Sequence, residues 1–207
     1  MDRFIRLAAD TVDGDLTVGR FVAYQTDMTI RCEYDETYFN KCAGYEGQTI
    51  ARKINAGRAA LVNKYWGGRV CDVGIGCGEF IRARPMTYGT DVNQVALKWL
   101  RENGKEAIGD FTAYTFWDVL EHVPKPEEYL DRIPVGGLLF TSIPIFDDLG
   151  KIRESKHYRP GEHLYYFTDH GLVSWLALHG FELLERQSFE IEAGRDSIFS
   201  YAFRRER

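Results

Sequence analysis

Short apolar runs alternate with helical segments from residue 49 to near the end of the chain. Each run is short and dense in apolar or β-branched side chains, which is typical of strands buried on both faces. The predicted strands are residues 69–73, 87–90, 106–108, 113–117 and 138–143. This alternation favours parallel strands joined by helical crossovers, and therefore a doubly wound α/β sheet.

Helix boundaries are marked by capping and stop residues. A first helix is expected from Thr49 to the paired glycines Gly67 and Gly68, and two later helices begin after the N-caps Asn93 and Thr168. The crossover after the first strand is short and is broken by Pro85, so its helix has room for only a turn or two.

The last part of the chain changes character. Residues 181–186 and 197–203 are strand-like, the second alternating aromatic with small or polar side chains, and residues 193–196 form a turn between them. An antiparallel pair is therefore expected at the C-terminal end of a mostly parallel sheet.

Residues 1–48 are the least regular part and are interpreted as an N-terminal extension or lid on a domain of residues 49–207. A turn signal at residues 12–15 separates two possible strands. Tyr34, Tyr38 and Tyr45 follow in a segment that closes over a cleft or packs as an ordinary amphipathic face. The extension, or a second subunit of a homodimer, is expected to cover the face left thin by the short crossover.

Composition restricts the class of protein. The chain has 207 residues, 44% hydrophobic and 28% charged, which indicates a folded globular protein. A net charge of −5 argues against a nucleic-acid binder. The N-terminus lacks the apolar region of a signal peptide and no run is long enough to span a membrane, so a cytoplasmic protein is expected.

Four cysteines stand at positions 32, 42, 71 and 77, without the spacing of a zinc clamp. Reduced thiols are the preferred interpretation, and a disulfide between Cys32 and Cys42 is the alternative.

The clearest motif is DVGIGCG, residues 72–78, between the first strong strand and a helix. Its glycines allow a sharp turn and a close approach of a ligand to the backbone. Glu79 occupies the sixth position of a GxGxxG count, where a dinucleotide fingerprint requires glycine, and no Gly-Lys-Ser/Thr follows. The motif therefore disfavours both a nicotinamide dinucleotide and a phosphate-binding loop.

A series of strings resembles the class I S-adenosylmethionine-dependent methyltransferases, and within them the ubiquinone-biosynthesis-like O-methyltransferase branch. They are VCDVGIGCGEF, TYGTDVN, TFWDVLEHVPKPEEYL, GGLLFTSIP and EHLYYFTDHGLVSWLALHGFEL, within about residues 50–203. The resemblance implies a Rossmann-like class I methyltransferase fold and S-adenosyl-L-methionine as cofactor.

The resemblance also implies roles for individual residues. Those implied to bind the cofactor are Asp72, Gly74, Gly76 and Gly78 under its methionine part, Arg58 at its carboxylate, Asp91 at the ribose hydroxyls, Asp110 and Phe111 at adenine, and Trp117 and Asp118 at the pocket wall. Alternatives remain for several of them, and Gly74 and Gly76 also suit an ordinary strand-to-helix turn. Arg52 competes with Arg58, Asp91 is also a plausible helix cap, and Trp117 is also a plausible core residue.

The expected reaction is transfer of a methyl group to a small-molecule acceptor, with oxygen as the expected acceptor atom. A base is optional for such a displacement. His157 is the first candidate and His163 the second, although His163 and the pair Glu121-His122 also suit structural roles. No metal is expected, because no cluster of ligands is evident from the spacing.

Two other classes stay open at this stage. One is an oxidoreductase of the Rossmann type, which the glycine spacing disfavours. The other is a cofactor-binding module that has lost its chemistry and acts through a partner surface.

Overall fold

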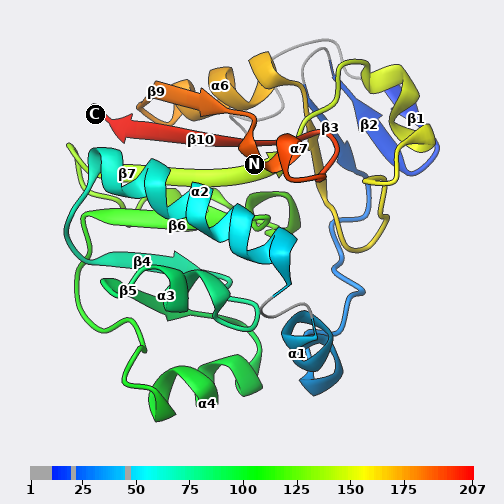
Figure 1. The fold of residues 1–207 in the computed structure, drawn as a ribbon. Helices are drawn as coiled ribbons and strands as arrows, with labels where there is room; N and C mark the ends of the chain where they lie inside the picture. The colour runs from blue at the N-terminus through cyan, green and yellow to red at the C-terminus, as the bar shows by residue number, and fades with distance from the viewer. Residues whose placement is uncertain (1–10, 20–21, 45–47) are drawn as a thin grey trace.

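The computed structural model describes residues 11–19, 22–44 and 48–207. Its main sheet has six strands in the order β5-β4-β6-β7-β10-β9 (Figure 1). The strands are β4 (Val70–Val73), β5 (Thr87–Thr90), β6 (Ala113–Trp117), β7 (Leu138–Pro144), β9 (Phe181–Gln187) and β10 (Ile198–Arg205). β5, β4, β6 and β7 are parallel, whereas β10 is antiparallel to both β7 and β9. The expected mostly parallel sheet with a C-terminal antiparallel pair is confirmed.

Helices cover both faces of this sheet, as a doubly wound fold requires. They are α1 (Glu36–Ala43), α2 (Thr49–Tyr65), α3 (Glu79–Ala83), α4 (Gln94–Glu102), α5 (Glu127–Leu130), α6 (Asp169–Leu178) and α7 (Phe189–Glu192), with 3₁₀ turns η2 (Leu120–His122) and η3 (Leu149–Glu154). Because successive strand side chains point to opposite faces, Phe116 packs in the cluster that contains Trp175 of α6, while Trp117 packs in the cluster that contains Leu61 of α2.

The crossover helix α3 is only five residues long, as expected from Pro85. The face that it leaves thin is covered in part by the N-terminal segment, since Phe39 of α1 packs against the cluster that contains Ile81 and Leu100. Asn93 caps α4 by accepting a hydrogen bond from the backbone of Val95, as predicted.

A second sheet has the order β1-β2-β3-β8 and is antiparallel throughout. Its strands are β1 (Thr11–Asp13), β2 (Leu16–Val18), β3 (Val22–Gln25) and β8 (Tyr165–Phe167). Three strands therefore come from the N-terminal extension and one from the segment after β7. The extension shares a sheet with the larger part of the chain (Figure 1).

The predicted strand at 106–108 is wrong in extent. Only a single parallel bridge, between Gly89 and Glu106, stands at that edge of the main sheet. Few residues separate α4 from β6, so this segment turns after one bridge instead of forming a strand followed by a helix. In the part of the chain that the structure describes, no helix is long and apolar enough to cross a membrane. All four cysteines are free thiols.

Candidate functional site

A cavity of about 640 Å³ opens at the carboxyl ends of β4, β5 and β6. Open α/β sheets place their ligands at this edge. The residues after the three strands form its floor, α2 and α3 form one wall, and the segment around α1 forms another. Of the residues expected from the sequence, the cavity is lined by Arg58, Asp72, Gly74, Gly76, Asp91, Trp117 and Asp118.

The three glycines of the loop have different tasks. Gly74 and Gly76 line the cavity with φ of 75° and 57°. A Cβ on Gly74 would stand 2.7 Å from Cγ2 of Val119, so a side chain there would collide with the next loop. Gly78 does not line the cavity. It begins α3 in the left-handed conformation, and a Cβ there would meet the Trp99 ring at 2.7 Å.

Asp72 is a buried carboxylate on the cavity wall, with 1% of its surface exposed. Burial raises its pKa to about 7, although a hydrogen bond donated by Thr115 to Oδ1 at 2.6 Å acts in the opposite direction. An ionised Asp72 therefore gains stability from a cation in the cavity.

Asp91 ends β5 and holds the loop in place. Its Oδ1 accepts a hydrogen bond from the backbone of Asn93 at 2.8 Å, and its Oδ2 accepts one from the backbone of Gly76 at 3.3 Å. The backbone groups of Ile75 and Val92 also act on this carboxylate, which lines the cavity. The cap of α4 is Asn93 and not Asp91.

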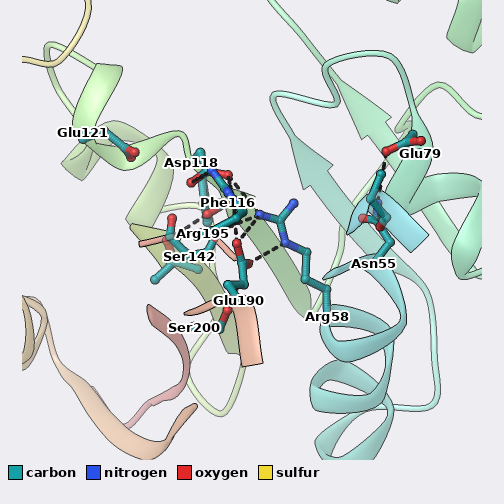
Figure 2. Close-up of polar contacts among 12 residues, drawn as sticks. Asn55, Arg58, Glu79, Phe116, Asp118, Glu121, Ser142, Glu190, Arg195 and Ser200 are labelled. Carbon is teal, nitrogen blue, oxygen red and sulfur yellow. Dashed lines mark hydrogen bonds and ion pairs between the residues drawn. The ribbon is translucent and has the colours of Figure 1, made fainter. Parts of the chain in front are cut away.

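Arg58 projects from α2 into a buried polar cluster (Figure 2). Its Nε donates to Glu190 at 2.8 Å, and its Nη2 donates to Asp118 at 2.9 Å and to Ser142 at 3.0 Å. Among the described residues its hydrogen bonds use Nε and Nη2, and Arg58 lines the cavity, so Nη1 is the group left for a ligand. Trp117 lies 4.9 Å from the guanidinium and supports it from the ring face.

Glu190 and Arg195 complete this cluster, and sequence reasoning missed both. Arg195 donates from Nη1 to Asp118 at 2.8 Å and also pairs with Glu190. Burial alone would raise the pKa of Asp118, but the two arginines hold that pKa far below its ordinary value. Asp118 also has a φ of 57°, a left-handed conformation that is uncommon outside glycine. Two arginines and two carboxylates thus form a balanced cluster behind the cavity.

The N-terminal segment supplies another wall, which comes close to the glycine loop at Cys42. Tyr34, Tyr38 and Cys42 line the cavity, and the rings of the two tyrosines meet edge to face at 5.0 Å. Burial raises the pKa of both tyrosines well above its ordinary value, so both are neutral donors. Tyr45 lies outside the described residues.

Two expected cofactor residues are not brought to the cavity. Asp110 is exposed, and Phe111 is buried between Tyr88 and Tyr114 in the core. Both residues precede β6, so they lie near its amino end, whereas the cavity lies at the carboxyl ends of the strands. Because no helix separates the bridge at Glu106 from β6, the chain has no segment that would return to the cavity there.

The two histidines expected to act on the acceptor do not line the cavity either. His157 is buried, and its Nε2 lies 2.8 Å from the backbone oxygen of Asp196, so the connection before β10 holds the ring. His163 is buried behind His122, and the two ring centroids are 4.6 Å apart. His122 lines the cavity instead. Burial, with His122 adding to it, lowers the pKa of His163 to about 3, so that ring is neutral.

Sequence reasoning also missed the wall supplied by α5 and the residues after it. Tyr129 and Arg132 both line the cavity. Their spacing of three residues places them on one side of a helical turn, which is the signal that could have identified them.

The main sheet is doubly wound and has a glycine loop, two strand-end carboxylates and a cavity at its carboxyl edge. These features are typical of α/β proteins that bind a nucleoside-containing cofactor. The Methyltransferase domain family matches residues 47–186, and the chain belongs to this family. No curated protein matches the chain.

Solved structures share the fold at low sequence identity. Magnesium protoporphyrin IX methyltransferase from Synechocystis PCC 6803, solved with bound SAH, has a TM-score of 0.60 and 15% identity over 83% of this chain and 96% of its own. A putative methyltransferase in complex with the Haloferax volcanii Trm112 activator has a TM-score of 0.63 and 12% identity, over 86% and 100%. The Burkholderia thailandensis 1,6-didemethyltoxoflavin-N1-methyltransferase has a TM-score of 0.57 and 15% identity, over 97% and 100%.

Proposed function

We propose that the protein is an S-adenosylmethionine-dependent methyltransferase that methylates an oxygen of a small-molecule acceptor. The observation that carries this proposal is the pair Asp72 and Asp91, which stand at the carboxyl ends of neighbouring parallel strands and face one cavity beside a glycine-rich loop. When bound, this cofactor would supply a methyl group on a positively charged sulfur. The acceptor oxygen would bond to the methyl carbon while the carbon–sulfur bond breaks and S-adenosylhomocysteine leaves.

The electrostatics of the cavity suit this cofactor better than a dinucleotide. Glu79 lines the cavity in the first turn of α3, where a pyrophosphate would require bare donors, and Asn55 donates to it at 3.3 Å. A ligand with an ammonium and a sulfonium is attracted by the same carboxylates that would repel a phosphate. The oxidoreductase alternative is therefore disfavoured.

Asp91 and Arg58 would bind different parts of the cofactor. Asp91 faces the cavity from the end of β5 and would accept hydrogen bonds from the ribose hydroxyls. Charge-assisted bonds of this kind are about twice as strong as neutral ones. Arg58 offers its Nη1 group to the carboxylate of the methionine part, while Glu190 and Asp118 hold the rest of its guanidinium. Burial acts to lower the pKa of Arg58, but these carboxylates raise it, so Arg58 is a permanent cation.

The acceptor is expected at the end of the cavity away from Asp91, between the α1 segment and the loop after β6. Tyr34, Tyr38, His122 and Tyr129 line this end and present flat aromatic rings that carry hydroxyl groups and ring nitrogens. This composition suits an aromatic hydroxyl compound. The likeness of TFWDVLEHV to the ubiquinone-biosynthesis-like branch supports oxygen as the acceptor atom. Tyr34 and Tyr38 would also exclude water from the transfer, which is the role proposed for the extension as a lid.

Calorimetric titration with S-adenosylhomocysteine tests the cofactor assignment, because this ligand is stable and requires no acceptor. Micromolar affinity, equivalent to about −8 kcal/mol, is expected. Asp91→Asn should weaken binding while Asp147→Asn, a matched change at an exposed position, should leave it unaltered. Absence of binding by the folded wild-type protein would contradict the proposal. Binding without transfer to any hydroxylated aromatic acceptor would favour the non-catalytic module.

A further inference from the structure

Glu121 is a buried carboxylate without a hydrogen-bond donor. It follows β6 in the turn η2, 1% of its surface is exposed, and neither oxygen accepts a hydrogen bond from any residue in the described ranges (Figure 2). A buried polar group without a hydrogen bond lowers the stability of the fold, because folding removes the water molecules that solvate it. Such groups in folded proteins therefore usually have a partner. The position of Glu121 beside the cavity makes a ligand the natural partner.

The neighbouring His122 directs a lone pair toward this carboxylate. Its Nδ1 lies 2.9 Å from the backbone oxygen of Glu162, and a carbonyl oxygen only accepts, so Nδ1 carries the proton. The other ring nitrogen, Nε2, is therefore an acceptor, and it lies 3.8 Å from Oε1 of Glu121. No hydrogen bond joins these two atoms, so a cation in the space between them would be bound by both.

His163 completes the group from a different part of the chain. It precedes β8, 4% of its surface is exposed, and its ring stands at 84° to that of His122. One ring nitrogen from each histidine and one oxygen of Glu121 all lie within 4.8 Å of one another. Two imidazoles and one carboxylate thus lie around one small space.

We propose that Glu121, His122 and His163 bind a divalent transition-metal ion of the zinc class at the acceptor end of the cavity. Two histidines and one carboxylate form a ligand set that zinc and iron(II) accept, whereas magnesium and calcium prefer oxygen ligands. Metal–ligand distances of about 2.0–2.2 Å require the three atoms to approach to roughly 3.3 Å in tetrahedral geometry. Binding of an ion therefore requires the three side chains to rotate toward one another.

The contact between His122 and Glu162 supports the same assignment. Histidines that bind metals usually donate their second ring N–H to a carbonyl or carboxylate, which fixes the tautomer and the ring orientation. The backbone oxygen of Glu162 does this for His122 at 2.9 Å. Glu162 immediately precedes His163, so the same segment fixes one ligand and supplies another.

With three protein ligands, the ion keeps a position for a ligand from the cavity, since His122 lies on the cavity wall. A hydroxyl oxygen of the acceptor bound there would lose its proton more readily, because a metal ion lowers the pKa of a coordinated oxygen. This use of the ion rests on the proposed function. The ion site itself does not.

The untagged full-length protein, treated with a chelator and dialysed, is titrated with Zn²⁺ by calorimetry and with Co²⁺ by visible absorption. One ion per chain is expected, with Co²⁺ bands typical of nitrogen and oxygen ligands. Glu121→Gln and His163→Ala should each weaken binding by at least about tenfold. His170→Ala, which removes an exposed histidine of α6, should bind like the wild type.

Binding of no ion by the wild type would overturn the proposal, as would equal affinity in Glu121→Gln, a variant of nearly unchanged shape that decides the matter if His163→Ala does not fold. Circular dichroism establishes folding of each variant. S-adenosylhomocysteine is titrated into the same samples without metal. Loss of that binding in the wild type would contradict the proposed function and leave the ion measurement intact.

Discussion

The Nε of Arg58 lies 2.8 Å from Oε1 of Glu190, and neither side chain has a substantial exposed surface. This contact links α2, which precedes the first strand of the main sheet, to α7, which lies between its last two strands. Ser200 of β10 also donates to Glu190 Oε1, at 3.1 Å. The cavity wall thus depends on residues that precede the first strand of the main sheet and on residues around its last two strands along the chain.

Glu190→Ala is expected to lower the free energy of unfolding by about 3–5 kcal/mol, because it removes one of the two carboxylates that Arg58 and Arg195 share and leaves two buried cations on Asp118 alone. Urea unfolding followed by circular dichroism measures the change. Glu182→Ala, at an exposed position in β9, is the matched control and should change stability by less than about 0.5 kcal/mol. Equal stability of the two variants would show that the cluster contributes little.

Cofactor binding should become tighter as pH rises from about 6 to about 8. Burial raises the pKa of Asp72 to about 7, so the carboxylate is largely protonated at the lower pH and ionised at the higher. A cationic cofactor favours the ionised form, and the expected gain in S-adenosylmethionine affinity is up to about tenfold. Calorimetry at several pH values measures it.

Asp72→Asn is the control for this pH dependence, since the same ligand ionises identically in both titrations and Thr115 can still donate to Asn Oδ1. The variant should lose the part of the dependence that belongs to Asp72. Parallel curves for the wild type and the variant would exclude Asp72 as the titrating group. The same raised pKa predicts that the contribution of Asp72 to stability falls as pH rises from about 4 to about 7, because the unfolded chain releases this proton first. The lowered pKa of His163 acts in the opposite direction over this range, so the difference in stability between the wild type and Asp72→Asn is the quantity that should fall.

Asp91→Asn and Asp110→Asn should differ sharply in cofactor affinity, although both aspartates were expected at the cofactor. The first should weaken S-adenosylhomocysteine binding by about 10- to 100-fold, as the loss of charge-assisted hydrogen bonds implies. The second changes an exposed residue outside the cavity and should have no effect. A loss at Asp110 would show that the segment before β6 reaches the ligand.

Gly89→Ala should destabilise the fold by about 1–3 kcal/mol through overpacking. A Cβ on Gly89 would collide with the side chain of Ile75 and stand 3.0 Å from Cδ1 of Ile81, so the glycine loop and α3 would have to shift. Thermal unfolding of Gly67→Ala, where no atom lies within 4 Å of the added Cβ, is the control. Similar melting temperatures for the two variants would contradict the tight packing behind the loop.

Local patterns identified the parts of the fold that depend on local sequence. The strand over residues 113–117 was predicted with the observed bounds, because five consecutive buried positions leave little choice of register. The strand predicted at residues 106–108 was too long, because the sequence pattern alone does not show that the chain must turn into β6 within a few residues. The pairing of β3 with β8 was not predicted, since neither strand signals its partner.

The candidate site divides in the same way. Asp72, Gly74 and Asp91 could be predicted because parallel strands end at one edge of the sheet, so spacing within each segment was sufficient. Glu190 could not, because it reaches Arg58 across 132 positions. The cluster of Glu121, His122 and His163 was hidden for the same reason, as two of its ligands are adjacent and the third comes from another segment.

The sheet shared by β3 and β8 has a consequence for biosynthesis. Gln25 donates a side-chain hydrogen bond to Tyr166, 141 positions later. At translation rates of about 5–20 residues per second, the N-terminal strands emerge on the order of ten seconds before their partner strand exists. During that interval β3 has an unpaired edge, which is a target for chaperones or for another nascent chain. The segment that lines one side of the cavity is therefore synthesised before β8, the strand that pairs with it.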